Sequence, residues 1–361
     1  MRSLWPCIVI ALIPILAGQP QPQLRLLATL EGSRPTPFSS NIALSPDGKF
    51  LASNTDGMVK LWDVERRQVL TTLRGNVVQG LTFSPDGKTL ATASAAVQLW
   101  DVAKGTELAT LKTDPAKFGF VAFSPDGKTL AAAGESGKND RKGVVTLWDV
   151  DTHKQKLDLT GYSGSIFCVT FSRDRKLVAA GGGHFASNGQ AGAGEVTIWD
   201  ATTGKEKATL KAGEGEGEGD AFIELVMSLA FSPDGKTLAL AGIYGNVVLW
   251  DLRTGKRTAT LQRFNPKGKE DDINSAYSVV FTPDGNLLIG GTLHGLKFWD
   301  VSRGKQVDSL KPAAAAVWSV ALSRDGKTLA TAEGSFENRL RDLKEPTIKL
   351  WRFSTGKTTD Q

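Results

Sequence analysis

The chain has 361 residues, of which 40% are apolar and 22% charged, and its formal net charge at neutral pH is +5. These values are ordinary for a soluble globular protein, and the many glycines lack the period that a collagen-like chain requires. The basic residues are spread along the chain and form no stripe, so we expect no nucleic-acid partner.

The N-terminal segment has the three parts of a secretory signal peptide. Arg2 precedes an apolar run from Leu4 to Leu16, and the small residues Ala17 and Gly18 follow it. We therefore expect a signal peptide over 1–18 and an exported protein, either periplasmic or extracellular. The apolar run is too short to span a bilayer comfortably, so no membrane span is expected after cleavage. Because the positive region is thin, an uncleaved N-terminal anchor is the alternative.

The two cysteines predict no disulfide. Cys7 lies in the expected signal peptide, and Cys168 stands alone in the apolar stretch SIFCVTF. A lone cysteine in such a setting is usually a small core residue, so we expect Cys168 to be buried.

A turn of the form Ser/Thr-Pro/Arg-Asp-x recurs seven times after this segment, three times inside the identical nonapeptide FSPDGKTLA. Serine first, proline second and glycine last are the composition of a type I turn. Short β-prone runs on both sides predict a hairpin at each copy. The turns begin at Ser45, Ser84, Ser124, Ser172, Ser232, Thr282 and Ser323.

A second motif, apolar-x-apolar-Trp-Asp, follows every turn at intervals of about 40 to 50 residues. The pairs are Trp62–Asp63, Trp100–Asp101, Trp148–Asp149, Trp199–Asp200, Trp250–Asp251 and Trp299–Asp300, while Trp351 precedes an arginine. In VTIWD, Val196 and Ile198 lie on one strand face and Thr197 and Trp199 on the other, so we expect this strand to be buried on both faces. A glycine-containing turn and a last strand follow, which predicts four antiparallel strands in each of seven units.

Together, the Trp-Asp pairs and the SPDG turns resemble those of the WD40-repeat β-propeller family, over residues 22 to 353. The resemblance is to an exported, bacterial-type member with seven blades, and it implies an all-β fold of four-stranded antiparallel blades over 19–361. The family's Gly-His dipeptide is missing, so the resemblance implies that its histidine-dependent hydrogen-bond network is not formed. The segment QLRLLATLEG, Gln23 to Gly32, resembles the outer strands. We therefore expect this N-terminal strand to complete the last blade.

The resemblance also implies that two kinds of turn share one face of the propeller, and that the longer loops lie on the other. These are the SPDG turns and the glycine-containing turns after the Trp-Asp strands, such as ATTGK. All five long insertions fall on that second face, which favours it for recognition because variable loops on a rigid scaffold usually carry binding. The insertions are Gly134–Gly143, Gly181–Gly194, Lys211–Ala221, Gln262–Ser275 and Glu333–Pro346.

The innermost strand of each blade supplies the candidate contact residues. In the family, the residue four places before the last residue of this strand often touches partners. Blades 4 to 7 carry large apolar residues there, and two further apolar residues lie two places earlier, in blades 1 and 5. The predicted partner-binding residues are Phe167, Met227, Tyr277, Trp318, Phe38 and Leu225. Such a composition is typical of an interface core, and the alternative is that these side chains are buried among the blades.

No enzymatic motif is present in the sequence. The five GKT triplets lack the preceding glycine of a phosphate-binding loop, and His184, His294 and Asp56 are too scattered in sequence to predict a metal site. We expect a monomeric, non-catalytic scaffold that binds a protein and has no cofactor. The alternatives are a dehydrogenase- or lactonase-like enzyme with its site at the channel mouth, and an envelope-assembly factor.

Overall fold

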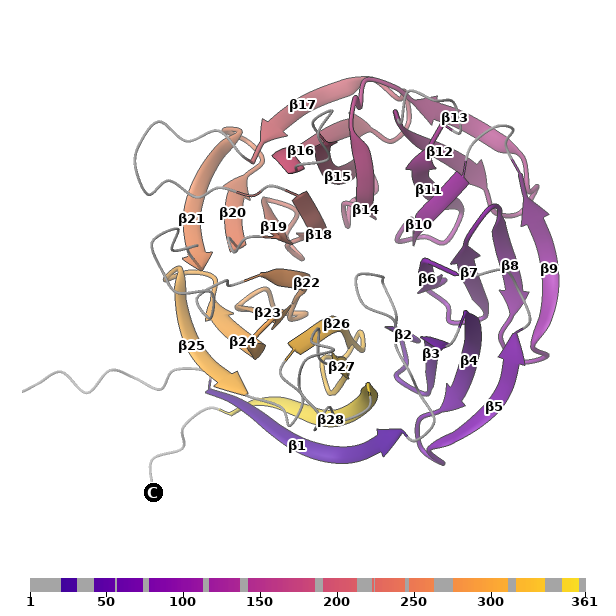
Figure 1. Ribbon diagram of the computed structural model, residues 1–361, viewed down its shortest axis with the longest axis vertical. Coiled ribbons are helices and arrows are strands. Elements are labelled where there is room, and N and C mark those ends of the chain that lie inside the picture. The colour runs from indigo at the N-terminus through magenta and orange to yellow at the C-terminus, as the bar shows by residue number, and fades with distance from the viewer. Residues whose placement is uncertain are drawn as a thin grey trace, which may run out of the picture.

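The computed structural model describes residues 21–30, 42–55, 57–73, 78–112, 117–136, 142–185, 191–212, 223, 225–243, 247–262, 275–310, 316–334 and 346–356. They form seven four-stranded antiparallel sheets that surround a central axis as the blades of a propeller (Figure 1). The predicted all-β, seven-bladed architecture is confirmed. Within these ranges there is no long apolar helix of the kind that crosses a membrane.

Each blade begins with a strand beside the axis (Figure 1). From blade 1 to blade 7 these inner strands are β2 (Ile42–Leu44), β6 (Gly80–Phe83), β10 (Lys117–Phe123), β14 (Ser165–Phe171), β18 (Leu225–Phe231), β22 (Ala276–Phe281) and β26 (Ala316–Leu322). The second strands are β3 (Phe50–Thr55), β7 (Thr89–Ala93), β11 (Thr129–Glu135), β15 (Leu177–Phe185), β19 (Thr237–Ile243), β23 (Leu287–Thr292) and β27 (Thr328–Gly334).

The two remaining strands of each blade lie further from the axis. The third strands, which carry the motif tryptophans, are β4 (Met58–Asp63), β8 (Val97–Asp101), β12 (Gly143–Asp149), β16 (Ala191–Asp200), β20 (Val247–Asp251), β24 (Gly295–Asp300) and β28 (Thr347–Gly356). The outer strands are β5 (Gln68–Leu73), β9 (Thr106–Leu111), β13 (Gln155–Leu159), β17 (Glu206–Lys211), β21 (Lys256–Gln262), β25 (Lys305–Leu310) and β1 (Gln21–Leu30).

The last blade is closed by the N-terminal strand. β1 pairs antiparallel with β28, with Leu24 opposite Phe353 and Leu30 opposite Ile348. Figure 1 shows β1 at the rim beside β28, so the first and last described strands share one sheet. The closure expected for the segment from Gln23 is thereby confirmed, and both strands gain a partner that covers an otherwise free edge.

The hydrophobic core lies between the blades. Each of the core clusters among the described residues joins two adjacent blades. Val196 and Ile198 pack in the cluster between blades 4 and 5, whereas Trp199 packs in the cluster between blades 3 and 4. The prediction that the Trp-Asp strand is buried on both faces is therefore confirmed. Burial of the apolar side chains of neighbouring blades holds the ring together.

Part of the tryptophan hydrogen-bond network forms without histidine. In blades 1, 2 and 7 the indole N–H donates to a hydroxyl on the second strand, from Trp62 to Ser53 (2.8 Å), Trp100 to Thr92 (3.0 Å) and Trp351 to Thr331 (3.0 Å). The equivalent second-strand residues of blades 3, 5 and 6 are Ala132, Leu240 and Gly290. Correspondingly, the buried Nε1 atoms of Trp148, Trp250 and Trp299 have no partner in the described part of the chain.

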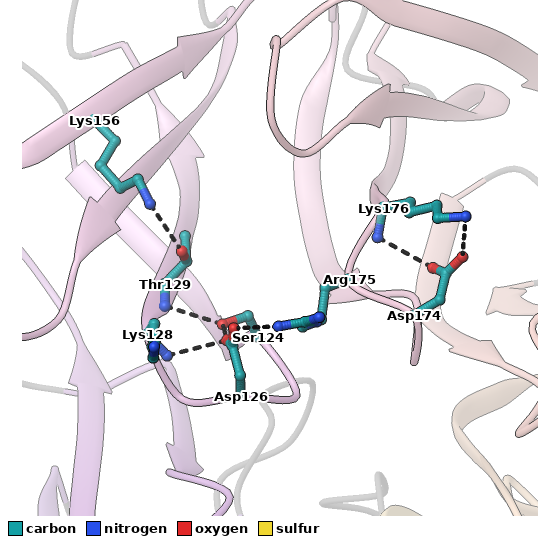
Figure 2. A network of polar contacts seen from close by, with 8 residues as sticks. All are labelled: Ser124, Asp126, Lys128, Thr129, Lys156, Asp174, Arg175 and Lys176. Atoms are coloured by element: carbon teal, nitrogen blue, oxygen red, sulfur yellow. Dashed lines mark hydrogen bonds and ion pairs between the residues drawn. The ribbon is translucent and has the colours of Figure 1, made fainter.

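The SPDG-type turns share one geometry. In the first, the Gly48 N–H donates to the Ser45 carbonyl (2.8 Å), the Ser45 hydroxyl donates to Asp47 (2.7 Å), and Gly48 has a φ of +70°. This left-handed φ explains the glycine at the fourth position. In blade 4 Arg175 occupies that position with a φ of +67°, and its guanidinium contacts Asp126 of the blade 3 turn at 3.0 Å (Figure 2).

The aspartates of the Trp-Asp pairs stabilise the turn between the third and outer strands. Asp63 accepts a hydrogen bond from the Arg66 N–H (2.7 Å), and Asp200 accepts one from the Thr203 N–H (2.9 Å). Such side-chain acceptors satisfy turn N–H groups that have no strand partner. The inner and third strands of one antiparallel sheet run in the same direction, so this turn lies on the same face as the SPDG turn. We call this face the turn face and the opposite one the loop face.

Candidate partner-binding surface

The candidate residues lie at the loop-face ends of the inner strands. Phe167, Met227 and Tyr277 are near the starts of β14, β18 and β22, whereas the SPDG-type turns follow the ends of these strands. The three strands belong to consecutive blades around the axis (Figure 1). Residues that are far apart in the sequence are thus brought to adjacent positions around one end of the propeller axis.

A β-bulge positions each of these residues. In blade 4, Ile166 pairs with Gly182 and Cys168 pairs with Gly181, which leaves Phe167 as an extra residue. A bulge bends its strand and redirects the extra side chain. The inner strands of blades 3, 5, 6 and 7 shift register at the corresponding place, and β2 and β6 pair without a shift. The extra residues there are Gly119, Met227, Tyr277 and Trp318.

The bulged residues of blades 4 to 6 are accessible. Phe167, Met227 and Tyr277 are half-buried, so each keeps part of its surface in contact with solvent. The Phe167 ring meets Phe120 of blade 3 edge to face, with centroids 6.4 Å apart and planes at 79°. Aromatic pairs of this geometry are favourable beyond their buried area. The Phe120 contact therefore helps to fix the orientation of Phe167.

Tyr277 is neutral at physiological pH. Burial raises the pKa of its phenol, and although a hydrogen bond with Ser275 partly opposes this effect, the pKa is about 12. The side chain therefore keeps its O–H together with a largely apolar body. Side chains that combine these properties are enriched in protein interfaces.

Hydrogen bonds between neighbouring inner strands hold this surface in place. The Ser228 hydroxyl accepts a bond from the Val279 N–H (3.1 Å), and the Ser278 hydroxyl accepts one from the Val320 N–H (3.2 Å). Both serines directly follow a bulged residue, and each ties its strand to the next blade. The bulges of blades 5 and 6 are therefore part of a rigid framework.

Two of the six predicted contact residues offer almost no surface. Trp318 is 2% exposed and Leu225 is 7% exposed. The indole of Trp318 lies against Gly334 of β27, where a Cβ atom would come within 2.1 Å of the ring. Although Trp318 is bulged like its counterparts, the lack of a side chain at Gly334 lets its ring lie against the same blade. Phe38 lies outside the described residues. Phe167, Met227 and Tyr277 thus make up the accessible set, which we call the bulge patch.

Polar side chains lie near the loop-face end of blade 4, where Ser165 begins β14 opposite Gly183 of β15. The Ser165 hydroxyl donates to Glu135 of blade 3 (3.3 Å), and the His184 Nε2 atom lies 3.8 Å from the Glu195 carboxylate. Sequence reasoning missed Glu135, Ser165 and Glu195, because their proximity depends on strand register and blade packing. An apolar centre with polar groups at its edge is the usual arrangement of a protein interface.

The described residues include no group of three histidine, cysteine, aspartate or glutamate side chains placed to hold a metal ion. Asp56 lies outside those residues. Cys168 is 9% exposed, and burial raises the pKa of its thiol well above the ordinary value. The prediction that Cys168 is a core residue is confirmed, since a neutral, enclosed thiol is a poor nucleophile.

Four segments of the chain, 24–63, 67–101, 153–200 and 218–251, match the family model described as WD domain, G-beta repeat. Each segment contains one of the Trp-Asp motifs of the sequence.

Curated relatives are similar at low identity. MST50-interacting protein 11 of Pyricularia oryzae is 27% identical over 85% of this chain and 93% of its own length. Protein tipD of Dictyostelium discoideum is 26% identical over 60% of this chain, and small ribosomal subunit protein RACK1y of Oryza sativa is 28% identical over 54%. The chain spans 32% and 49% of the lengths of these last two relatives.

Proposed function

We propose that this chain, which belongs to the WD40-repeat family, is a non-catalytic scaffold that binds a protein partner on its loop face. WD40 propellers are typically protein-interaction scaffolds and are usually non-catalytic. The name of the relative from Pyricularia oryzae describes that protein as an interacting protein. These findings support the general role, and the accessible residues of this chain alone support the choice of binding face.

The bulge patch is the observation that carries the proposal. Three consecutive blades place an accessible phenylalanine, methionine and tyrosine at the same strand position, each on a β-bulge. These residue types are enriched in interface cores, and large aromatic anchors often supply most of the binding energy. Blades 2 and 3 instead have Gln79 and Gly119 at this position. The partner therefore contacts the arc of blades 4 to 6.

Site-specific photo-crosslinking tests the face. A photo-reactive amino acid at position 167 is expected to capture the partner in cells that produce the protein. The matched control is position 70, because Leu70 is also apolar and is 47% exposed on the outer strand β5. The same adduct from both positions, or an adduct from position 70 alone, contradicts the assignment to the loop face.

Export is the second part of the proposal. The predicted signal peptide, 1–18, lies outside the described residues, and β1 begins at Gln21. Cleavage after residue 18 would therefore leave the closing strand intact, as the fold requires. Mass spectrometry of the purified mature protein from the envelope or the medium measures its N-terminus. A full-length protein found only in the cytoplasm would overturn the export proposal.

A further inference from the structure

A cavity opens on the turn face, where sequence reasoning expected no binding. Its volume is about 380 Å³, and it is lined by inner-strand ends and SPDG-type turns from six of the seven blades. It therefore lies at the turn-face end of the propeller axis. This volume falls within the range of about 300 to 1,000 Å³ that is usual for ligand sites.

The walls of this cavity are mostly apolar. Pro46, Pro85, Pro125 and Pro283, each the second residue of its turn, contribute their rings, and Phe281 lies at the end of its inner strand. A proline has no backbone N–H, so these walls donate no hydrogen bonds from those positions. An occupant must consequently present apolar groups to most of the lining.

Two turns depart from the proline pattern. Blades 4 and 7 carry Arg173 and Arg324 at the second turn position, and both line the cavity. Both are exposed, and neither guanidinium has a side-chain partner among the described residues. Blades 4 and 7 are not neighbours in the ring, so the two charges reach the cavity from separate sides.

Nearby acidic groups do not neutralise these arginines. No acidic residue lines the cavity, and the aspartates next to the two arginines, Asp174 and Asp325, accept hydrogen bonds within their own turns. Asp174, which follows Arg173, accepts hydrogen bonds from the Ser172 hydroxyl (2.7 Å) and the Lys176 N–H (3.1 Å). The second arginine of this turn, Arg175, is occupied by Asp126 of blade 3 (Figure 2). The cavity is therefore an apolar funnel with two available guanidinium groups.

We propose that this cavity, which we call the arginine mouth after Arg173 and Arg324 in its lining, binds an acidic peptide segment of a protein partner. Guanidinium groups bind carboxylates through paired, charge-assisted hydrogen bonds, and the proline and phenylalanine walls suit apolar side chains next to the acidic ones. An extended segment can place acidic side chains beside the two guanidinium groups, which lie on separate sides of the cavity. It can also place apolar side chains against the walls between them. The arginine mouth is on the opposite face from the bulge patch and is a second binding site, independent of it.

Fluorescence anisotropy with a labelled peptide of alternating glutamate and leucine tests the arginine mouth. The peptide is expected to bind at least about tenfold more tightly than its counterpart with glutamine in place of glutamate. The double variant Arg173→Pro/Arg324→Gln should reduce binding of the acidic peptide to the level of its neutral counterpart. Proline at 173 restores the residue found in most other turns, and glutamine at 324 keeps the N–H that donates to the Pro46 carbonyl (3.1 Å).

Arg175→Gly is the matched control. It removes a charge from the same turn but not from the cavity lining, so binding should stay within about twofold of the wild type. Equal binding of both peptides, or an equal loss in Arg175→Gly, would overturn the proposal.

Displacement of the peptide by inorganic phosphate at equal concentration would also overturn it, in favour of a free-anion site. Met227→Glu should leave peptide binding unchanged, which separates a failure here from a failure of the loop-face proposal. Thermal unfolding checks that all variants fold.

Discussion

At the scale of single residues, the blades differ in how they satisfy one buried indole N–H. Blade 1 has Ser53 where blade 3 has Ala132, and the two positions have the same strand register relative to their tryptophans. Trp62 therefore donates to a hydroxyl, whereas the buried Nε1 of Trp148 has no partner among the described residues. An unpaired buried donor carries a desolvation cost of about 1 to 3 kcal/mol. The comparison of the two blades thus predicts that a serine at position 132 would stabilise the folded protein.

Ala132→Ser should raise the free energy of unfolding by about 1 kcal/mol, because the new hydroxyl accepts the Trp148 N–H as Ser53 does for Trp62. Ala133→Ser is the control, since Ala133 packs in a different cluster, between blades 3 and 4, and its hydroxyl would be buried away from Trp148. Denaturant unfolding of the three proteins measures the effect. An equal loss of stability in both serine variants would contradict the prediction, because it would show that the hydroxyl at position 132 accepts no hydrogen bond from Trp148.

A second residue-scale prediction concerns pH. Burial raises the pKa of Asp126, but hydrogen bonds from Ser124, Arg175 and the Lys128 N–H outweigh it and bring the pKa to about 2. Because this value is below that of the unfolded chain, the unfolded state binds the proton more tightly, and stability falls as the pH drops from about 4 to 2.

Arg175→Gly should raise the pKa of Asp126 toward, but not to, its ordinary value, since the Ser124 and Lys128 contacts remain. The acid-dependent loss of stability between about pH 4 and pH 2 should become smaller, because the folded and unfolded pKa values of Asp126 would differ less. Carboxyl NMR titration of both proteins measures the pKa. An unchanged value would show that the Arg175 contact does not persist in solution.

At the scale of elements, the pairing of β1 with β28 joins the two ends of the described chain. Leu30 of β1 is 2% exposed and packs in the cluster between blades 7 and 1, whereas Leu26 of the same strand is 47% exposed. β1 therefore supplies both the missing outer strand and part of the core of the adjacent interface. In blade 7, Glu333 and Lys349 also form a buried ion pair (2.6 Å) that links β27 to β28.

Leu30→Ala should lower the free energy of unfolding by about 2 to 5 kcal/mol, because it leaves a cavity between blades 7 and 1. Leu26→Ala removes the same atoms from an exposed position and should change stability by no more than about 0.5 kcal/mol. Chemical denaturation followed by tryptophan fluorescence compares them. Equal effects of the two substitutions would contradict closure by β1.

At the scale of the whole molecule, sequence periodicity was sufficient to predict the propeller fold. Each copy of the turn predicts a hairpin, and each copy of the Trp-Asp motif predicts a strand that is buried on both faces. Periodicity also located the bulged positions, since they stand at a constant distance from the turn. Periodicity could not predict that Trp318 is buried, because this depends on the missing Cβ of Gly334 on another strand. Nor could it predict the arginine mouth, because Arg173 and Arg324 line one cavity only when the ring closes.

The two proposed sites lie on opposite faces of one rigid ring. The bulge patch is apolar with a polar edge, and the arginine mouth is an apolar funnel with two positive charges. A scaffold with this arrangement can hold two different protein segments at once, because neither site includes residues of the other. The proposed scaffold role depends first on the contact between a partner and the loop face at blades 4 to 6.

The most direct test is the affinity of the crosslinked partner for two matched variants. Met227→Glu places a charge in the bulge patch, and Leu108→Glu places the same charge on the outer strand β9, where Leu108 is 50% exposed. With folding checked by thermal unfolding, Met227→Glu should weaken binding at least about tenfold and Leu108→Glu should leave it within about twofold. Wild-type affinity in Met227→Glu, or an equal loss in Leu108→Glu, would contradict the account.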